Sequence, residues 1–379
     1  MDQWRLVDVG MLPSLDTQTV YHAVALARSE GIVPDTLILC YPENPLICIG
    51  YHQVINLEID VDFCNSRDIP IVRRCLGGGT VLLDKNQLFY QVIVGRDNPK
   101  IPLSVRGLFE TLLRPVAYAF QNFGIPAKYK PINDIEVDGK KISGNGAGLV
   151  EKANVLTGNM IFDFDYDTMV SCFKTPSEKF KDKLAKSLRE RVTTIKRELG
   201  DKTPSREVAK KTLISCFEKF LDIQLVYSEL TRKEGELIKE LNEQYNSDEW
   251  LFMHEHRKPN LASPTRTLKI SARSRIVETT FKAPGGLIRA TLEIDDKNKI
   301  VDVLVSGDFW VYPKETLKEL ENTLIGCNID EKEILNAIYH FYKATNVKTP
   351  GMLPEDFAKT ILSTKNAKTY PNTPLFPIK

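Results

Sequence analysis

The sequence predicts an α+β fold in two parts, a larger N-terminal one and a smaller C-terminal one. Through the first two thirds of the chain, apolar stretches of strand length are interspersed with amphipathic segments of helical period. In the last third, predicted strands come first and helices follow, which is typical of a small α+β layer. The length of 379 residues suits two domains, since one domain takes about 150 residues.

The larger part begins with a strand from residue 4 that leads into an amphipathic helix at 17–29. Apolar runs then predict two more strands, a further helix and the strand that leads to the first motif. These elements are 35–40, 46–50, 56–67 and 68–72. Beyond the motif, the pattern predicts strands at 87–94 and 155–162, a long helix at 106–123 and helical structure throughout 205–246.

The smaller part is predicted to start near residue 245, which gives domains 1–245 and 246–379. Its predicted strands are 266–270, 276–281, 287–294 and 300–305, and a hairpin turn lies at 295–298. Helices are predicted at 315–324 and 331–342.

Composition excludes several functions. With 51 basic and 50 acidic residues, the chain lacks the clear positive charge of a nucleic-acid binder. No run of about 18 apolar residues predicts a membrane span, and the N-terminus lacks a signal-peptide pattern. Seven scattered cysteines without a CxxC pair predict reduced thiols in a cytoplasm. Five dispersed histidines offer no metal constellation.

A glycine-rich stretch lies between two predicted strands. It reads Arg73-Arg74-Cys75-Leu76-Gly77-Gly78-Gly79-Thr80-Val81-Leu82-Leu83-Asp84. Arginines supply permanent charge in a planar donor fork, and glycines let backbone N–H groups close on an oxygen-rich ligand, so the stretch suits anion binding. A glycine-rich turn beside two surface arginines is the alternative. A Walker A loop is excluded, because no Lys-Ser/Thr follows the glycines.

A second stretch, from Pro131 to Gly144, predicts a β-hairpin. Asp138-Gly139 favours a type I′ turn. The alternating apolar positions are Ile135, Val137 and Ile142. Because neighbours in a strand point to opposite faces, only one of Lys140 and Lys141 is expected to point inward with the apolar side chains. Without the glycine-rich stretch, a surface lysine would be the preferred interpretation of Lys141, and a turn former that of Asp134.

Together, about sixty residues apart, the two stretches resemble the catalytic signature of the lipoate–protein ligases, RRxxGGGxVxxD followed by NDI…GKKISG. These enzymes form part of the biotin/lipoate ligase superfamily. The resemblance implies a mixed sheet flanked by helices, as in class II aminoacyl-tRNA synthetases and biotin ligases. It also implies a fused C-terminal accessory domain. That part of the likeness rests on Tyr245…Asp248-Glu249-Trp250, Pro284-Gly285-Gly286-Leu287-Ile288-Arg289 and Ser306-Gly307-Asp308-Phe309-Trp310.

The resemblance implies a two-step activity. ATP and lipoate, or octanoate, first give an acyl-AMP and pyrophosphate, and a lysine amine of an acceptor protein then attacks the mixed anhydride. Implied acceptors are the E2 subunit of a 2-oxoacid dehydrogenase, the glycine cleavage H protein, or a stand-alone lipoate-binding protein. Because the first step gathers negative charge at one phosphorus, it needs fixed cations and oriented N–H donors.

Site residues follow from the same resemblance. Lys141 would bridge the carboxylate and the α-phosphate, while Asp134 and Asn133 would support Mg²⁺ through hard oxygen ligands. Arg74 and the glycine loop would hold nucleotide and acyl group, and Gln53, in a run that matches "IG-x-x-Q", would read the substrate. The remaining predicted binding residues are Gly77, Gly78, Gly79, Thr80, Val81, Leu82, Asp84, Ser143 and Gly144.

A strongly charged segment at 174–197 has two interpretations. Mixed charge of this density usually marks a solvated helix face. The resemblance implies instead a mobile loop that closes on the nucleotide, with Lys179, Lys183 and Arg191 as its candidate residues. Departures from the family pattern fall at Leu76, Thr80 and Leu83, and we expect them to make the pocket wall more apolar.

Two other functions stay open. An octanoyl- or lipoyl-transferase needs no ATP and forms a thioester on a cysteine. In one transferase branch that cysteine lies just upstream of Lys-x-x-Gly, but here no cysteine occurs between Cys75 and Cys172. Cys172 is the remaining candidate, with a small core residue as the alternative. The third hypothesis, a non-catalytic relative, is disfavoured by the retained Arg74, Asp84 and Lys141.

Overall fold

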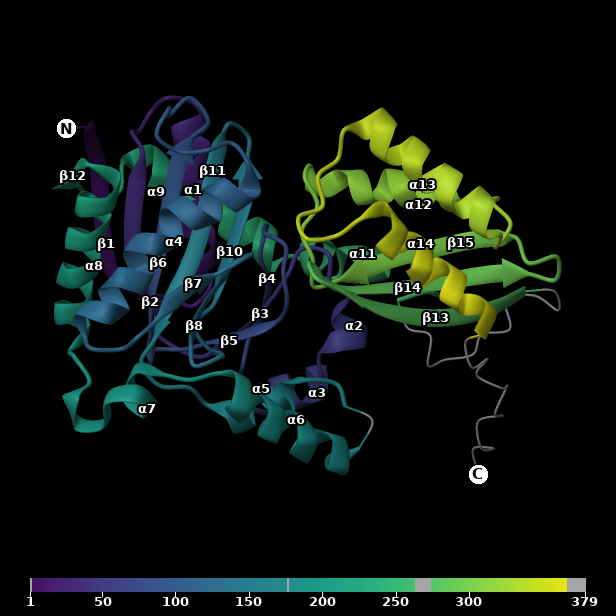
Figure 1. The fold of residues 1–379 in the computed structure, drawn as a ribbon, viewed down its shortest axis with the longest axis horizontal. Helices are drawn as coiled ribbons and strands as arrows, with labels where there is room; N and C mark the ends of the chain where they lie inside the picture. Colours follow the sequence, from purple (N-terminus) through teal and green to yellow (C-terminus); the bar gives the residue numbers. More distant parts are fainter. Residues whose placement is uncertain (1, 176, 263–273, 367–379) are drawn as a thin grey trace. The chain divides into compact units, whose positions relative to one another are not determined.

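The computed structural model describes residues 2–175, 177–262 and 274–366, which fall into two compact units (Figure 1). The first unit comprises Met1–Tyr51 and Ile59–Leu251, and the second His52–Glu58 and Phe252–Lys379. The C-terminal division therefore falls after Leu251, and Tyr245 and Trp250 belong to the first unit. The predicted strand at 266–270 lies outside the described residues.

A six-stranded mixed sheet forms the centre of the first unit, in the order β10-β11-β6-β2-β1-β12. Strand β1 pairs in parallel with β2 and β12, and the other neighbours are antiparallel. The strands are β1 (Asp2–Leu12), β2 (Thr36–Pro42), β6 (Gln87–Gly95), β10 (Asn145–Val150), β11 (Ala153–Ile161) and β12 (Ile223–Tyr227).

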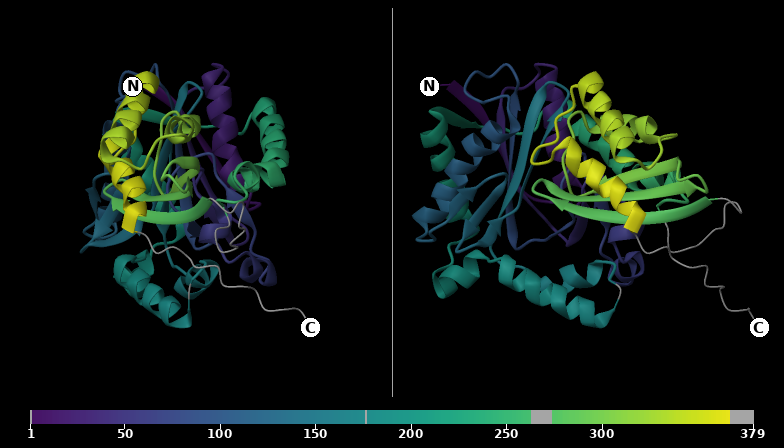
Figure 2. Two further views of the ribbon diagram at one scale, coloured as in Figure 1. Left: turned by 90° about the vertical axis from the view of Figure 1, so that its right-hand side faces the viewer. Right: turned by 45° about the vertical axis from the view of Figure 1, so that its right-hand side comes forward.

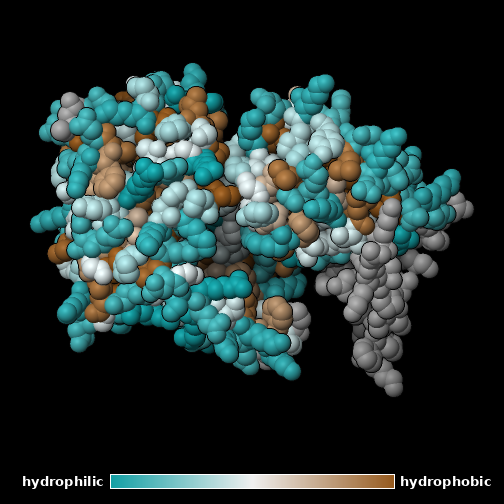
Figure 3. Space-filling model, in the orientation of Figure 1, coloured by the Kyte–Doolittle hydropathy of each residue, from teal (hydrophilic) through white to brown (hydrophobic). Residues whose placement is uncertain are grey.

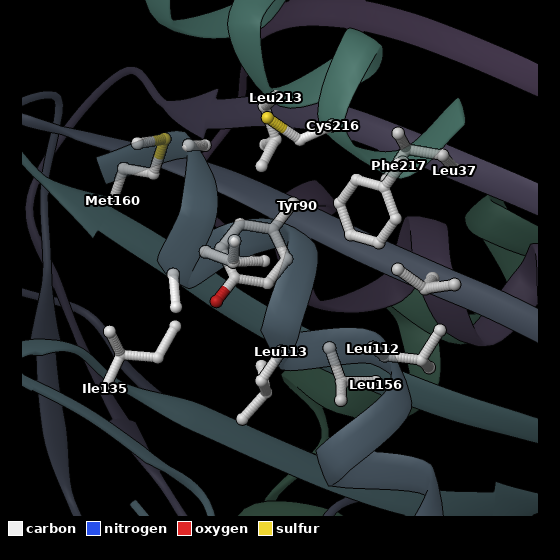
Figure 4. Close-up of a cluster of buried hydrophobic side chains, with 14 of the residues drawn as sticks. Leu37, Tyr90, Leu112, Leu113, Ile135, Leu156, Met160, Leu213, Cys216 and Phe217 are labelled. Atoms are coloured by element: carbon white, nitrogen blue, oxygen red, sulfur yellow. The ribbon is translucent and has the colours of Figure 1, made fainter. Parts of the chain in front are cut away.

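Helices cover both faces of this sheet, so the predicted α+β class with a flanked mixed sheet is confirmed (Figures 1 and 2). Helices α1 (Asp16–Ser29) and α9 (Arg232–Asn246) share one core with the sheet, and α4 (Val105–Asn122) and α8 (Arg206–Leu221) share the other. Tyr90 of β6 lies in the second core beside Leu112, Leu113 and Phe217 (Figure 4). Every residue of β6 is buried, which explains its nearly continuous apolar sequence.

The prediction of helical structure throughout 205–246 is wrong, because β12 interrupts it. Asp222 ends α8 in the left-handed conformation, with φ of 51°, which Asp tolerates better than most residues. The alternating burial of Ile223 and Leu225 then allows this short segment to extend the sheet beside β1. A strand of five residues between two strong helical patterns is too short to give a distinct signal in the apolar period.

Short elements complete the first unit. Two three-stranded sheets carry the motifs, one in the order β4-β3-β5 and one in the order β7-β8-β9. Their strands are β3 (Leu46–Ile49), β4 (Ile71–Arg73), β5 (Val81–Leu83), β7 (Lys128–Lys130), β8 (Asp134–Val137) and β9 (Lys140–Ser143). The remaining α-helices of this unit are α3 (Val61–Ser66), α5 (Tyr166–Cys172), α6 (Glu178–Arg191), α7 (Ile195–Leu199) and α10 (Asp248–Leu251).

The helix predicted at 56–67 is in fact two helices. Asp60 caps α3 by accepting a hydrogen bond from the N–H of Phe63, and this cap starts a new helix. The preceding helix α2 (Ile55–Glu58) belongs to the second unit. There the C=O of His52 accepts a hydrogen bond from the N–H of Gly307, and the His52 ring stacks on Phe309.

The second unit is a three-stranded antiparallel sheet with helices α12 (Leu317–Leu324), α13 (Glu331–Thr345) and α14 (Pro354–Leu362) packed on one face (Figures 1 and 2). Its strands are β13 (Ser274–Ala283), β14 (Gly286–Asp295) and β15 (Ile300–Gly307), and it also contains helix α11 (Met253–Arg257). Three of the four strands predicted here lie where the structure has β13, β14 and β15, and α14 was not predicted.

Candidate active site

The glycine-rich motif forms a loop between two strands that both pair with β3. Strand β3 runs parallel to β4 and antiparallel to β5, so residues 74–80 cross from one side of β3 to the other. Gly78 has φ of 91°, a conformation that L side chains rarely adopt. A Cβ atom at Gly50 would lie 1.8 Å from the C=O oxygen of Gly78. Glycine is thus required on both sides of this close approach.

Arg74 stabilises the glycine loop through hydrogen bonds to its backbone. Its guanidinium donates to the C=O of Gly77 at 2.7 Å, to that of Gly79 at 2.8 Å and to that of Cys48 at 3.3 Å. The rigid fork of a guanidinium suits several acceptors at once. In this structure Arg74 therefore fixes the backbone of the loop.

Arg73, its neighbour, is fully buried, with 0% of its surface exposed. Its guanidinium donates to the C=O groups of Tyr51 at 3.0 Å and of Leu251 at 2.7 Å. The indole N–H of Trp250 in turn donates to the C=O of Arg73 at 2.8 Å. The two arginines of the motif thus have different partners: Arg73 ties together distant segments of the first unit, and Arg74 shapes the glycine loop.

Leu76 and Leu83, two of the departures from the family pattern, are buried, with 2% and 8% of their surface exposed. Both belong to the hydrophobic core shared with α1 and α9. Leu76 lies against the backbone of Gly148 in β10, where an added Cβ would meet Leu76 Cδ2 at 2.3 Å. A leucine at the position before the glycines is accommodated because residue 148 has no side chain.

Gly148→Ala should therefore destabilise the first unit. Overpacking a filled core costs about 1–3 kcal/mol, and we expect a loss in that range by urea unfolding. The double variant Leu76→Ala, Gly148→Ala removes the clashing methyl group, so its loss should be smaller than the sum of the two single losses. Additive losses would contradict this packing.

The second motif is the predicted hairpin. Asp138 and Gly139 have φ of 48° and 77°, as a type I′ turn requires. The register shifts after Ile135, so Ser143 and Lys141 pair with consecutive residues of β8 and Ile142 is left as the extra residue of a bulge. The simple alternation expected for Lys140 and Lys141 is interrupted here, and both are partly exposed. Bulges of this kind often redirect side chains near active sites.

Lys141 and Asp134 form an ion pair on this hairpin. The ammonium Nζ lies 2.6 Å from Asp134 Oδ1, and the two side chains are 35% and 33% exposed. Asn133, beside Asp134, donates through its amide to the C=O of Asn145 at 2.7 Å and accepts from the Asn145 amide at 2.9 Å. A solvent-accessible ammonium is thus held by one carboxylate next to a rigid turn.

Buried polar side chains connect the two motifs, and sequence reasoning missed them. Asn159 of β11 accepts from the N–H of Gly144 at 2.8 Å and donates to Gln87 Oε1 at 2.6 Å. Gln87 donates to the C=O of Leu82, on the strand after the glycine loop, at 3.0 Å. The sequence did contain a signal for this connection, namely amide side chains within the apolar strands β6 and β11. A buried amide must find a hydrogen-bond partner, so such residues indicate a buried polar contact.

A second polar group supports the same hairpin. The Tyr90 hydroxyl lies 2.9 Å from Ser143 Oγ and also donates to Asn145. Burial raises the pKa of Tyr90, so the group stays a neutral phenol. Ser143 is therefore a buried member of the scaffold in this structure.

The charged segment 174–197 is mostly helix α6, and no described side chain of that helix is buried. Lys179, Lys183 and Arg191 are exposed on it, and the surface there is largely hydrophilic (Figure 3). Directly after the helix, Val192 forms a parallel bridge with Lys141, and the N–H of Thr193 donates to the C=O of Lys141 at 2.9 Å. The segment thus contacts the lysine hairpin through its C-terminal end.

Two other predicted binding residues, Asp84 and Gln53, are buried. Asp84 is buried, accepts from the N–H of Asn86 at 2.9 Å and so forms the turn into β6. Burial raises the pKa of its carboxyl group, although the hydrogen bonds from Asn86 act in the opposite direction. Gln53 is buried in the segment His52–Glu58, which belongs to the second unit.

The cysteine expected of a transferase is not exposed. Cys172, at the end of α5, is 1% exposed. A hydrogen bond with Cys64 and burial raise the pKa of the Cys172 thiol. Six of the seven cysteines are buried, Cys327 being the partly exposed one. Among the described residues, no three His, Cys, Asp or Glu side chains are grouped to hold a metal ion.

Two family models match this chain. Residues 16–218 match the lipoyl protein ligase A/B catalytic domain, and residues 277–361 match the bacterial lipoate protein ligase C-terminus. Fold and site therefore define an enzyme of the lipoate ligase and transferase class. The chain belongs to the lipoyl protein ligase A/B family.

Curated relatives include both activities of this class. Octanoyltransferase LipM of Geobacillus kaustophilus (strain HTA426) is 29% identical over 273 residues, which are 66% of this chain and 98% of LipM. Lipoate-protein ligase LplJ of Bacillus subtilis (strain 168) is 30% identical over 303 residues, which are 79% of this chain and 84% of LplJ.

Solved structures show the same fold. A bi-partite lipoate protein ligase of Thermoplasma acidophilum, from a study with its E2 lipoyl domain, has a TM-score of 0.59 at 27% identity, covering 66% of this chain and 97% of its own. Lipoate-protein ligase A bound with ATP has a TM-score of 0.56 at 25% identity, covering 66% of this chain and 99% of its own. Within the described parts of the chain, no helix is long and apolar enough to cross a bilayer.

Proposed function

We propose that this protein is an ATP-dependent lipoate–protein ligase. It would activate lipoate or octanoate to the acyl-AMP and then transfer the acyl group to a lysine of an acceptor protein. The observation that carries the proposal is the Lys141 ammonium, which is partly exposed and held 2.6 Å from Asp134. Hydrogen bonds connect its hairpin to the strand that follows the glycine loop.

Lys141 supplies the charge that acid activation needs. When the substrate carboxylate attacks the α-phosphate, negative charge develops on the phosphoryl oxygens and pyrophosphate leaves. An ammonium is a compact point charge with three donors, so one group can contact both the carboxylate and the α-phosphate. Asp134 keeps this ammonium oriented before the substrates arrive and thereby reduces the reorganisation needed in the reaction.

The glycine loop supplies N–H donors. Since Arg74 occupies the C=O groups of Gly77 and Gly79, those carbonyls are turned away from a bound anion, and N–H groups of the loop can face it. Mg²⁺ commonly takes one or two carboxylates together with substrate phosphates and water. The partly exposed carboxylate of Asp134 could be such a ligand, and Mg²⁺ bound there would neutralise phosphate charge.

The C-terminal unit favours ligase over transferase. LipM is matched over 98% of its length by 66% of this chain, so about a third of this chain lies beyond the octanoyltransferase. Residues 277–361 match the bacterial lipoate protein ligase C-terminus. The acceptor we propose is a lipoyl domain, because a ligase of this fold was studied together with its E2 lipoyl domain. We further propose a cytoplasmic location.

A cysteine-dependent octanoyl or lipoyl transferase is the second candidate, favoured by the likeness to LipM over nearly its full length. Such an enzyme would use a thiolate. Cys172 is the candidate that the sequence leaves, yet it is buried and the pKa of its thiol is raised, so it is poorly suited to attack at neutral pH.

ATP–pyrophosphate exchange with lipoate or octanoate distinguishes the two candidates. We expect acid-dependent exchange in the wild type and in Cys172→Ser at similar rates, within about threefold, because Cys172 takes no part in adenylation. Acyl transfer from an octanoylated donor protein without ATP is the parallel assay. Loss of that ATP-independent transfer in Cys172→Ser, with no exchange in the wild type, would establish the transferase.

A further inference from the structure

A chain of side-chain amides runs from the lysine hairpin to the strand after the glycine loop. Its members are Gly144, Asn159, Gln87 and Leu82, joined by hydrogen bonds of 2.8, 2.6 and 3.0 Å. The chain crosses from the hairpin through β11 and β6 to β5. Two buried side chains thus link the lysine hairpin to the strand that follows the glycine loop.

The direction of each hydrogen bond in the chain is determined. A backbone N–H can only donate, so Asn159 must present its carbonyl oxygen to Gly144. Its NH₂ group then faces Gln87, which must accept with Oε1. The NH₂ group of Gln87 is left to donate to the C=O of Leu82. All three links are consistent with this one arrangement, and reversing either amide would place like groups together.

Burial makes the chain rigid. Gln87 is 0% exposed and Asn159 is 9% exposed. In such surroundings an amide that loses its partner pays a large desolvation cost, so the fully bonded arrangement is strongly preferred. The position of Gly144 is thereby set by residues of the central sheet.

The side chain of Lys141 lies near the same glycine. A Cβ at Gly144 would lie 3.6 Å from Lys141 Cε and 3.5 Å from Asn159 Oδ1. The last methylene of the lysine and the carboxamide therefore flank one piece of backbone. A shift of that backbone would move the ammonium, and errors of about 1 Å in the position of a reacting group can cost 10²-fold in rate.

From this geometry we infer that Asn159 is a positioning residue for Lys141. Through its hydrogen bonds to Gly144 and Gln87, it fixes the position of the lysine hairpin relative to β5, the strand that follows the glycine loop. The inference rests on the proposed function in one respect, namely that Lys141 performs the adenylation step. Asn159 itself need not touch substrate.

The principal test compares four proteins in ATP–pyrophosphate exchange: wild type, Asn159→Ala, Lys141→Ala and the double variant. We expect Asn159→Ala to lower kcat about 10- to 100-fold and to leave the KM for ATP within about threefold, because a misplaced ammonium acts on the transition state. In the Lys141→Ala background the same change should have little further effect. Equal losses in both backgrounds would overturn the inference.

Asn154→Ala is the matched control. Asn154 lies on the same strand, β11, and is also an asparagine, but five positions before Asn159 and away from the chain of amides. Its replacement should leave exchange within about twofold of wild type, as expected for a residue that does not support the site. A loss as large as that of Asn159→Ala would mean that any weakening of β11 suffices, and would overturn the specific role of Asn159.

Amide hydrogen exchange provides a readout that needs no activity. Asn159→Ala should accelerate exchange at residues 140–145 in the free protein, whereas Asn154→Ala should not. Unchanged protection of this segment in Asn159→Ala would overturn the inference. A wild type without pyrophosphate exchange would overturn the proposed function, and the hydrogen-exchange comparison would still decide whether Asn159 holds the hairpin.

Discussion

Replacing Lys141 with alanine should lower the rate of lipoate-dependent ATP–pyrophosphate exchange by about 10²–10³-fold, the loss typical of one preorganised electrostatic contact in a transition state. The side chain is 35% exposed and its described partner is Asp134. Truncation therefore removes charge from the site and leaves the core intact. We expect the urea midpoint of Lys141→Ala to stay close to that of the wild type. The lower exchange rate would then reflect the missing ammonium and not a less stable fold.

Two further variants sharpen this test. Lys140→Ala changes the neighbouring lysine of β9, which is also partly exposed, and should keep exchange within about twofold because a charge outside the site has little effect on the reaction. Lys141→Arg keeps the charge but replaces a compact ammonium with a planar fork, so it should not restore the rate. Full exchange in Lys141→Ala would leave the activation step without its cation and would refute the proposed mechanism.

Arg73→Ala should cause the second large effect, a loss of about 3–5 kcal/mol in the free energy of unfolding. Each buried acceptor left without a donor costs roughly 1–3 kcal/mol, and Arg73 supplies donors to the C=O groups of Gly50, Tyr51 and Leu251. Arg73→Lys should recover only part of the loss, because one ammonium cannot reproduce the geometry of the guanidinium fork.

Urea unfolding of the full chain measures this loss, with Arg232→Ala as the control. Arg232 is 94% exposed and pairs with Glu236 on the surface of α9, where an ion pair contributes about 0–1 kcal/mol. A loss for Arg73→Ala no larger than that of the control would show that the buried contacts of Arg73 are not needed for stability.

Local patterns sufficed for much of the fold. The apolar period gave β6, α4 and β11 close to their observed bounds, because these elements are long and buried on regular faces. Period alone failed at β12 and at the break between α2 and α3, where a left-handed Asp222 and the Asp60 cap act over one or two residues. Such short signals compete poorly with the flanking helical pattern.

The sequence by itself determined the α+β class and the two motifs, because turn chemistry, glycine content and apolar alternation are properties of neighbouring residues. Only the tertiary structure showed that Arg73 is buried and binds distant backbone segments, whereas Arg74 binds the backbone of the glycine loop. It also showed that Asn159 connects the lysine hairpin to Gln87. Asn159 and Gln87 are 72 positions apart, and Arg73 and Leu251 are 178 apart. Hydrogen bonds over such separations depend on which strands pair and on how helices pack beside them, and the local pattern of a chain does not contain that information.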